Sequence, residues 1–507
     1  MKFHSIALVL ALAGASSLDA AITPHALFSD GAVLQQGREI PVWGTANEGE
    51  SVRVEFAGQT LSTTAKDGKW SVRLKPVKAG GPFVMTLAGE NTVVLNDLWV
   101  GEVWICGGQS NMERQLGPRP PQKPIDGWEE EVRTANYPQM RQFLVPRVIP
   151  ASGAQPNVQS NWVTCSPQTA ANFSAVGYFF GRDLYRKLNV PIGLIACNWG
   201  GTPAETWTSR EALEAIPELR GIVENYDKAR SDYSAKLAAY QENEPKLREE
   251  HEAAVAKAKQ EGKRPPNPPA PPKDPAGSQF SPAVLRDAMV TPIVPYGIRG
   301  VIWYQGESNS RHGLQYRTLF PATIADWRKA WGQGDFPFLF VQIAPFKTNA
   351  PEVREAQFMA SRTVPNTAMV VTTDVGDAED IHPTRKGPVG ERLALAARAI
   401  AYGENLEFSG PAFRSATFSD GRATVQFDHL GGGLVAKDGS LKGFLIAGAD
   451  KQFVPAQAEI QGDTVVVSSE SVREPVAVRY GWATVPDVNL FNREGLPASP
   501  FRTDDWP

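Results

Sequence analysis

The chain has 507 residues, more than a single hydrophobic core usually supports, so the sequence predicts two or three domains. Hydrophobic residues make up 42% and charged residues 21% of the chain, which is typical of a soluble globular protein. The formal net charge of -4 gives no strong basic field, so nucleic acid is excluded as a partner.

The first 20 residues have the layout of a secretory signal peptide. A positive charge at Lys2 precedes an apolar run over 6–12, and small residues follow as far as Ala20. The apolar run is too short to span a bilayer, so we expect cleavage near Ala20 or Ala21 rather than a membrane anchor. The sequence therefore predicts a secreted or periplasmic protein with no membrane span after signal cleavage.

Residues 21–96 are predicted to form an N-terminal antiparallel β domain. Short strand-like runs cover 40–43, 51–56, 70–74 and 83–87, and several of them alternate polar with apolar residues. Glycine-rich turns separate these runs, as in a small antiparallel sheet.

Continuous apolar runs alternate with helical patterns between 97 and 405. Five runs are typical of strands buried on both faces of a parallel sheet: 103–106, 192–196, 301–304, 338–341 and 369–371. Helical periodicity lies between them, for example over 176–188 and 316–331. This alternation predicts a layered α/β domain with right-handed crossovers.

A charged, helix-favouring segment interrupts this domain at about 209–275 and ends in a proline-rich run from 264. We expect an inserted helical hairpin with a stiff connector and no catalytic part, a lid over the site being the alternative. A helix is predicted over 384–403. The strand pattern then returns, and it predicts a C-terminal β domain over 406–507.

The three cysteines, Cys106, Cys165 and Cys197, are too few for a disulfide scaffold. We expect free buried thiols. No Cys/His spacing indicates zinc, so neither a metal site nor a cofactor is expected.

Small and polar residues follow four of the buried runs. In open α/β sheets, ligands bind outside the carboxyl ends of the strands. The segments at these ends are 107–112, 197–202, 305–309 and 372–383. The sequence therefore predicts a site at this edge of the sheet.

Histidine 382 is the favoured general base. Of the six histidines, only His312 and His382 lie near strand ends of the α/β domain. A serine nucleophile needs a base poised near neutral pH, which histidine supplies. Pro383 restrains the backbone after His382 and favours a loop there.

Ser110 lies between a buried strand and a predicted helix start. A serine in that place can be a helix N-cap without any chemistry. Gly107 and Gly108 argue for more, because they allow a sharp turn and the close approach of a substrate. Met112 stands where the elbow G-x-S-x-G has its last glycine, so the α/β-hydrolase fold is disfavoured.

These segments resemble the motif set of the sialate O-acetylesterase family. The resemblance lies in Gly108-Gln109-Ser110-Asn111-Met112, in Gln305-Gly306-Glu307-Ser308-Asn309, in Asp380-Ile381-His382-Pro383, and in further stretches over most of the chain. That family belongs to the SGNH (GDSL-like) hydrolases. The resemblance implies a flavodoxin-like, three-layer, parallel-sheet α/β hydrolase domain with flanking β domains. It also implies a serine esterase that acts on an acetylated sugar or glycan.

The resemblance implies a role for each catalytic residue. Ser110 would attack the ester carbonyl, and His382 would take its proton and return it to the leaving sugar oxygen. An aspartate often stands three residues before the histidine in SGNH enzymes, where this chain has Glu379. Asp380 is the preferred orienting carboxylate, and Glu379 or a backbone carbonyl are the alternatives.

The resemblance also implies an oxyanion hole. Its donors would be the backbone N–H groups of Ser110 and Gly201 and one side-chain amide. Gln305 is preferred for that amide, and Asn309 is kept as a site residue. Two further residues are expected to line the substrate site: Gln109 and Glu307.

O-acetylated sialic acid is the preferred substrate, and acetylated xylan or another polysaccharide is the alternative. An arginine in the pocket would favour the carboxylate of sialic acid, and the candidates are Arg114, Arg210 and Arg311. A catalytically vestigial carbohydrate-binding protein is a second hypothesis. A glycosidase that uses Glu307 with Asp374 is a third.

Overall fold

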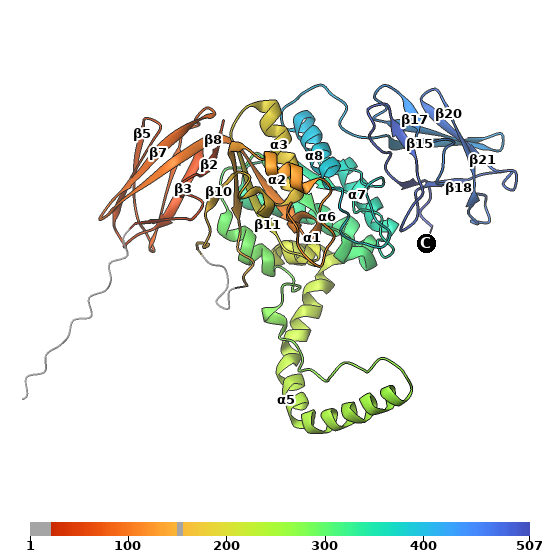
Figure 1. The fold of residues 1–507 in the computed structure, drawn as a ribbon, viewed down its shortest axis with the longest axis horizontal. Helices are drawn as coiled ribbons and strands as arrows, with labels where there is room; N and C mark the ends of the chain where they lie inside the picture. Colours follow the sequence, from red (N-terminus) through yellow and green to blue (C-terminus); the bar gives the residue numbers. More distant parts are fainter. Residues whose placement is uncertain (1–21, 150–155, 507) are drawn as a thin grey trace, which may run out of the picture.

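The structure is a computed structural model that describes residues 22–149 and 156–506. The predicted signal peptide over 1–20 lies outside the described residues. An N-terminal β region, a central α/β domain and a C-terminal β region follow one another along the long axis (Figure 1). Among the described residues, the search for a helix both long enough and apolar enough to span a bilayer finds none.

The N-terminal region is built from short strands, mostly antiparallel. They are β1 (Thr23–Pro24), β2 (Val33–Gln35), β3 (Ile40–Thr45), β4 (Ser51–Phe56), β5 (Gln59–Thr64), β6 (Lys69–Leu74) and β7 (Gly80–Ala88). Buried and exposed residues alternate along β4 and β6, because successive side chains of a strand point to opposite faces.

A long strand, β8 (Thr92–Gly108), joins this region to the central domain. Its first part pairs antiparallel with β7, and its last part pairs parallel with strands of the central sheet. Asp97 adopts a positive φ without ending the strand. The predicted boundary between 96 and 97 therefore falls inside one continuous strand that both parts share.

The central sheet contains all five predicted buried strands. In addition to β8 it holds β9 (Tyr137–Leu144), β10 (Trp162–Cys165), β11 (Ile192–Asn198), β12 (Gly300–Tyr304), β13 (Phe338–Val341) and β14 (Thr367–Val370). The order is β10-β9-β11-β8-β12-β13-β14. The strands are parallel except β10, which pairs antiparallel with β9. The sheet is thus mixed, a correction to the prediction of a parallel sheet, because a strand that pairs antiparallel with its predecessor needs no crossover helix.

The strand order places a ligand crevice next to β8. Across β11-β8-β12-β13-β14, numbering by chain order gives 2-1-3-4-5, so the direction of winding reverses beside β8. Loops on the two sides of such a switch point leave opposite faces of the sheet and open a crevice at the carboxyl ends of the strands.

Helices cover both faces of the central sheet. One layer holds α3 (Ala175–Leu188) and α8 (Gly387–Ile400), and the other holds α6 (Gly313–Trp331) and α7 (Pro351–Thr363). Val103 and Ile105 of β8 belong to the core with α6 and α7, while Trp104 and Cys106 belong to the core with α3 and α8. Burial on both faces explains the continuous apolar runs.

The three cysteines are buried and free, as predicted.

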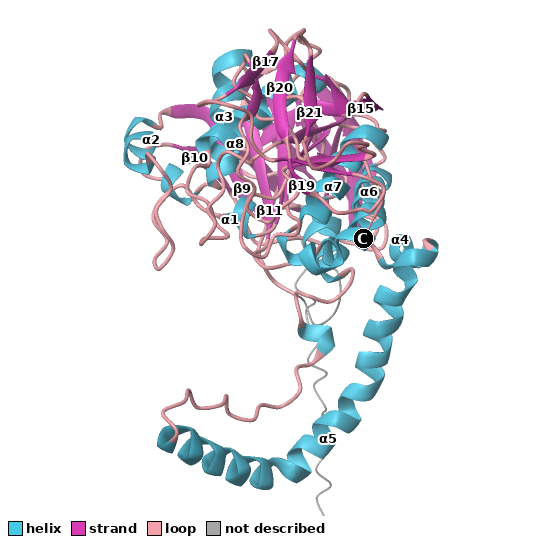
Figure 2. Cartoon of the chain, turned by 90° about the vertical axis from the view of Figure 1, so that its right-hand side faces the viewer, coloured by secondary structure: helices cyan, strands magenta, loops and turns pink. Residues whose placement is uncertain are grey.

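The charged insert forms α4 (Arg210–Ala215) and α5 (Pro217–Gln260). The predicted hairpin is wrong, because α5 is one long helix that contains Pro245; it projects from the body and bends part-way along its length (Figures 1 and 2). A single internal proline kinks a helix without reversing it. Only Leu219 and Val223 of α5 are buried, and an extended proline-rich segment leads back to the domain.

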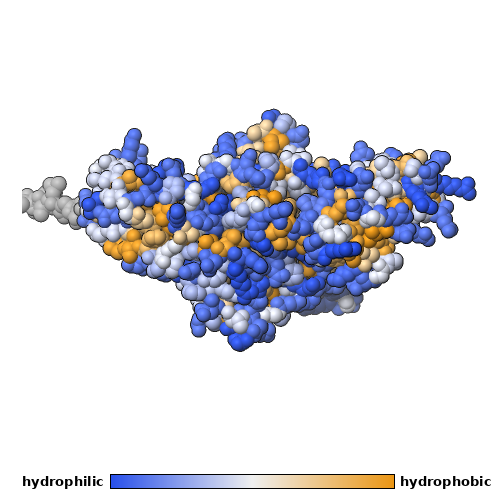
Figure 3. Space-filling view, turned by 90° about the horizontal axis from the view of Figure 1, so that it is seen from above, coloured by the Kyte–Doolittle hydropathy of each residue, from blue (hydrophilic) through white to orange (hydrophobic). Residues whose placement is uncertain are grey.

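The C-terminal region holds three small sheets around one core. Its strands are β15 (Ala412–Ser419), β16 (Arg422–Asp428), β17 (Leu434–Ala436), β18 (Phe444–Ala447), β19 (Val454–Pro455), β20 (Gln457–Gln461), β21 (Thr464–Ser468), β22 (Ala477–Tyr480), β23 (Leu490–Asn492) and β24 (Phe501–Arg502). In Figure 3 the apolar residues of the visible surface form separate groups among hydrophilic ones.

Candidate active site

Ser110 stands at the carboxyl end of β8, beside the switch point. It is the first residue of the short helix α1 (Ser110–Glu113), and Gln109 is the N-cap. Gly108 has a φ of +126°, and a Cβ there would lie 2.2 Å from the carbonyl oxygen of Tyr304, so only glycine fits. Within 22–149 and 156–506, the Ser110 hydroxyl makes no hydrogen bond, so the serine is not a cap. Its hydroxyl is free to react.

His382 lies in the loop between β14 and α8, with 21% of its side chain exposed. Burial and the nearby Lys386 ammonium lower the pKa of the imidazole below its usual value of 6.5. The ring is therefore neutral near pH 7 and able to accept a proton.

A hydrogen bond brings the Ser110 and His382 segments together. Asn111, the residue after Ser110, donates from Nδ2 to the carbonyl oxygen of Ile381 over 3.0 Å. Ile381 directly precedes His382. The two segments, which are 270 residues apart at this bond, thus meet at one edge of the sheet.

Asp380 is the carboxylate beside the histidine. Its Oδ1 lies 3.8 Å from His382 Nδ1 and accepts the backbone N–H of His382 over 2.9 Å. The distance to Nδ1 is longer than a hydrogen bond, so the carboxylate is bonded to the backbone of His382 and lies close to its ring. Glu379 is exposed and pairs with Lys347, so it does not face the ring.

A buried polar network lies behind Ser110. Asn111 donates to Glu307 Oε1 over 2.5 Å and accepts from Lys386 Nζ over 2.5 Å. Lys386 is fully buried, its ammonium lies 5.1 Å from the Tyr304 ring centroid, and burial lowers its pKa to about 7. The side chain of Asn111 is thereby held on both sides, and its backbone leads directly to Ser110.

Glu307 belongs to this network rather than to the substrate surface. It is 7% exposed, burial raises the pKa of its carboxyl, and its Oε2 has no partner among the described residues. This corrects the expectation that Glu307 contacts the substrate. Asp374, its proposed glycosidase partner, instead forms an ion pair with Arg392 at 2.6 Å.

Two backbone N–H groups near the Ser110 hydroxyl, those of Ser110 itself and of Gly201, are unpaired among the described residues. Gly200 lies against Ser110, because a Cβ added to Gly200 would be 3.3 Å from the Ser110 Cβ. Glu113 Oε2 accepts the Gly200 N–H over 2.5 Å and thereby holds this turn. In the described part of the chain the N–H groups of Ser110 and Gly201 have no acceptor. Both are available to an oxyanion.

The side-chain amide of Gln305 is already engaged inside the protein. Its Nε2 donates to Asn309 Oδ1 over 2.7 Å and to the Thr202 carbonyl over 3.3 Å, and its Oε1 accepts from Tyr316 over 2.9 Å. Gln305 is also fully buried, which corrects the preference for it as an oxyanion donor. Asn309 is 2% exposed and holds the backbone N–H of Ala204.

Gln109 is differently placed. Its Oε1 accepts the backbone N–H of Ser308 over 3.3 Å, while its Nε2 has no acceptor among the described residues. The amide donor next to Ser110 is thus free, whereas that of Gln305 is not.

Sequence reasoning missed several residues of this site. Asn111 and Glu113 lie within or next to the serine motif, and that position was the only available signal. Phe280 was missed as well: it is 53% exposed and approaches to 3.7 Å of the place where a Gly201 Cβ would be. Lys386 gave no signal, because its burial depends on residues far away in the chain, such as Asn111 and Tyr304.

The three candidate arginines differ in environment. Arg114 is buried and donates to Gln122 and to the backbone carbonyl of Lys123. Arg210 pairs with two acidic residues on the insert side. Arg311 is exposed, close to the segment after β12.

Over 22–149 and 156–506, no group of three or more His, Cys, Asp or Glu side chains is placed to hold a metal ion.

Comparison with known proteins points to the same chemistry as this geometry. The family described as carbohydrate esterase, sialic acid-specific acetylesterase matches residues 277–399. The chain is 33% identical to the sialate O-acetylesterase of Rattus norvegicus over 73% of this chain and 72% of that protein. It is 30% identical to the sialate O-acetylesterase of Mus musculus over 91% of this chain and 90% of that protein.

A solved structure agrees. A carbohydrate acetylesterase from Xanthomonas citri is similar with a TM-score of 0.80 and 36% identity, over 96% of this chain and all of that one. The resemblance found in the sequence motifs is confirmed. The chain belongs to the sialate O-acetylesterase family and is a carboxylic ester hydrolase.

Proposed function

We propose that this chain is a secreted serine esterase that hydrolyses O-acetyl esters on a glycan, with O-acetylated sialic acid as its preferred substrate. The observation that carries the proposal is the Asn111–Ile381 hydrogen bond, because it brings the nucleophile and base segments to one sheet edge. The sialate O-acetylesterase relatives support the choice of sugar.

In the proposed reaction Ser110 Oγ attacks the acetyl carbonyl while His382 accepts its proton. The imidazolium then protonates the departing sugar oxygen, and water, activated by His382, releases acetate from the acetyl-serine. The Asp380 carboxylate orients the ring through Nδ1 and stabilises the imidazolium.

The tetrahedral intermediate carries a negative oxygen that three donors would hold. They are the backbone N–H groups of Ser110 and Gly201 and the side-chain amide of Gln109, which takes the place first given to Gln305. Each preorganised donor of this kind is worth about 10²–10³ in rate.

Phe280 is the proposed platform for the sugar. Its ring is exposed beside Gly201, and an aromatic face packs well against the apolar face of a sugar ring. The proline-rich return of the insert leads to this residue. The insert thus ends at the site even though α5 itself projects away.

A polysaccharide acetylesterase is the second candidate. The similarity to the Xanthomonas citri carbohydrate acetylesterase covers 96% of this chain at the higher identity of 36%. A vestigial, purely carbohydrate-binding protein is not favoured, because Ser110 and His382 are both present and a hydrogen bond joins the residues next to them, Asn111 and Ile381.

The proposed superfamily is that of the SGNH hydrolases, with a flavodoxin-like central domain. The strand order 2-1-3-4-5 and the serine at the end of the first central strand support it. The N-terminal charge and apolar run support export, and hence a secreted or periplasmic location.

Acetate release from O-acetylated sialic acid and from acetylated xylan, measured side by side, tests the activity and the choice of sugar. We expect Ser110→Ala to lower turnover of both by at least about 10³-fold while the protein stays folded. Normal turnover by Ser110→Ala would refute the proposal. Faster release from xylan would favour the second candidate.

A further inference from the structure

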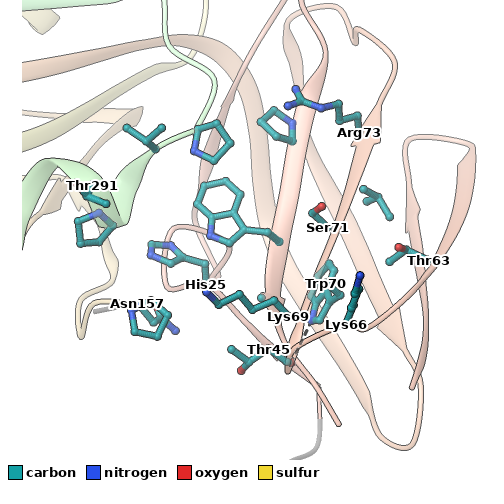
Figure 4. Close-up of a pocket in the computed structure, with 18 of the residues that line it drawn as sticks. His25, Thr45, Thr63, Lys66, Lys69, Trp70, Ser71, Arg73, Asn157 and Thr291 are labelled. Atoms are coloured by element: carbon teal, nitrogen blue, oxygen red, sulfur yellow. Dashed lines mark hydrogen bonds between the residues drawn. The ribbon is translucent and has the colours of Figure 1, made fainter. Parts of the chain in front are cut away.

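A cavity of about 710 Å³ lies where the N-terminal β region meets the central domain (Figure 4). Strands β3, β5 and β6 supply one wall. Asn157 and the segment that begins at Thr291 supply the other. Its volume is within the range of small-molecule sites, about 300–1,000 Å³. Since Ser110 and His382 are not among the lining residues, this cavity is distinct from the esterase site.

The lining of this cavity is basic. Lys66, Lys69 and Arg73 are exposed side chains on its β wall (Figure 4). None of them forms an ion pair with any residue that the structure describes, and the lining contains no aspartate or glutamate. A concave surface with charge of one sign concentrates ligands of the opposite sign.

A buried histidine in the lining has an unused donor. The backbone N–H of Leu27 donates to His25 Nδ1 over 3.2 Å, so the ring proton sits on Nε2. His25 is 1% exposed, and its Nε2 has no partner within 22–149 and 156–506. Burial lowers its pKa to about 4, so the ring stays neutral at physiological pH. A buried donor without an acceptor is destabilising, and an oxygen ligand that accepted its proton would remove that cost.

Trp43 adds a second donor beside the first. Its ring centroid lies 5.1 Å from that of His25, and its side chain is half-buried. The indole N–H has no acceptor in the described part of the chain. An aromatic ring, N–H donors and exposed cations together match a sugar that carries a carboxylate. The sugar ring would pack against the aromatic face, its hydroxyls would accept from the donors, and its carboxylate would bind the cations.

We propose that this cavity is an accessory binding site for an acidic glycan, one that contains a uronic or sialic acid. The site performs no chemistry, and it does not depend on the proposed esterase reaction. It holds a polymeric or glycoprotein-bound acidic glycan on the enzyme, which raises the concentration of that glycan near the Ser110 site.

Isothermal titration of the mature protein with ester-free oligosaccharides tests this site. The probes are oligogalacturonate, a sialyl trisaccharide and a neutral xylo-oligosaccharide of matched length. We expect an acidic probe to bind and the neutral one to bind at least about 10-fold more weakly, a difference of about 1.4 kcal/mol. Raising the salt from about 0.05 M to about 0.5 M should weaken the acidic probe.

Two variants and one control make the result specific. The double variant Lys69→Ala/Arg73→Ala changes only exposed side chains, and we expect it to raise Kd for the acidic probe about 10-fold or more. His25→Phe keeps an aromatic ring and removes the donor, and it should weaken the acidic and neutral probes alike. Lys75→Ala, an exposed lysine of the same region that does not line the cavity, should leave Kd within about twofold.

The proposal would be overturned by acidic probes that do not bind at millimolar concentration, by a double variant that binds like the parent, or by equal affinity for the neutral probe. Equal competition by inorganic phosphate would show a simple anion site and would also overturn it. Because no probe contains an ester, none of these outcomes depends on acetate release. Failure here is thus separate from failure of the esterase proposal.

Discussion

Replacing Lys386 with methionine perturbs the buried network at its charged end. The lysine is fully buried, and its Nζ donates to Asn111 Oδ1. Burial lowers its pKa from 10.5 to about 7 and outweighs the opposite effect of the Glu307 carboxylate. Methionine keeps the length and apolar stem of the side chain but cannot be charged, so Lys386→Met removes the proton-binding group and little volume.

The pKa difference sets the size and sign of the effect. A fall from 10.5 to about 7 means that the folded state binds this proton about 5 kcal/mol less favourably than the unfolded chain. The penalty is present in full below pH 7, where both states are protonated. It disappears as the pH rises toward 10.5, because only the unfolded chain then still binds the proton. The parent therefore gains about 2 kcal/mol of unfolding free energy from this lysine between about pH 7 and 9.

The effect is measured by guanidinium unfolding at these two pH values. Hydrogen exchange of β8 and β12 reports on the central domain. The unfolding free energy of Lys386→Met, taken relative to that of the parent, should fall by about 2 kcal/mol from about pH 7 to 9. Lys329→Met, which replaces an exposed lysine of α6, should show no such trend. A difference between parent and Lys386→Met that does not change with pH would refute the reasoning.

Three further predictions concern the reaction. The acid limb of the pH profile of kcat/KM should lie below pH 6.5, because burial and the charge of Lys386 lower the pKa of His382. Lys386→Met should move that limb to higher pH, and an unmoved limb would contradict the coupling between Lys386 and His382. In steady-state assays Asp380→Asn should lower kcat by about 10² or more, while kcat of Glu379→Gln should stay within about twofold of the parent value. The reverse ranking would transfer the orienting role to Glu379. Phe280→Ala should raise KM for an acetylated sugar about 10-fold with kcat nearly constant, and an unchanged KM would remove Phe280 from the sugar site.

Local sequence patterns were sufficient for the main elements of the fold. The five apolar runs form strands that are buried on both faces, and an unbroken apolar run is the local pattern that predicts such a strand. The shape of the insert was not readable in this way. Charge and helix propensity predict a helix. A hairpin would also need a second helix packed against the first, and α5 is instead one helix with only Leu219 and Val223 buried, so the predicted hairpin was wrong.

Strand pairing beyond neighbouring segments was equally hidden. The Asn96-Asp97 pair reads as a break between domains, yet β8 continues through it because its two halves have different partners, β7 on one side and β11 with β12 on the other. Pairing partners far apart in the chain leave no local signal, so the shared strand emerged only from the assembled sheets.

For the site, the sequence by itself determined which residue types stand at the strand ends: a serine after β8, a glycine pair after β11 and a histidine before α8. The tertiary structure decided which of them are free to act. Gln305 and Glu307 occupy promising positions, but both side chains are buried, and the Gln305 amide and one Glu307 oxygen are already hydrogen-bonded inside the protein, whereas Gln109 keeps an open donor. Burial and hydrogen-bond satisfaction depend on every neighbour in space, and neighbours such as Lys386 and Asn111 come together only when the chain is folded.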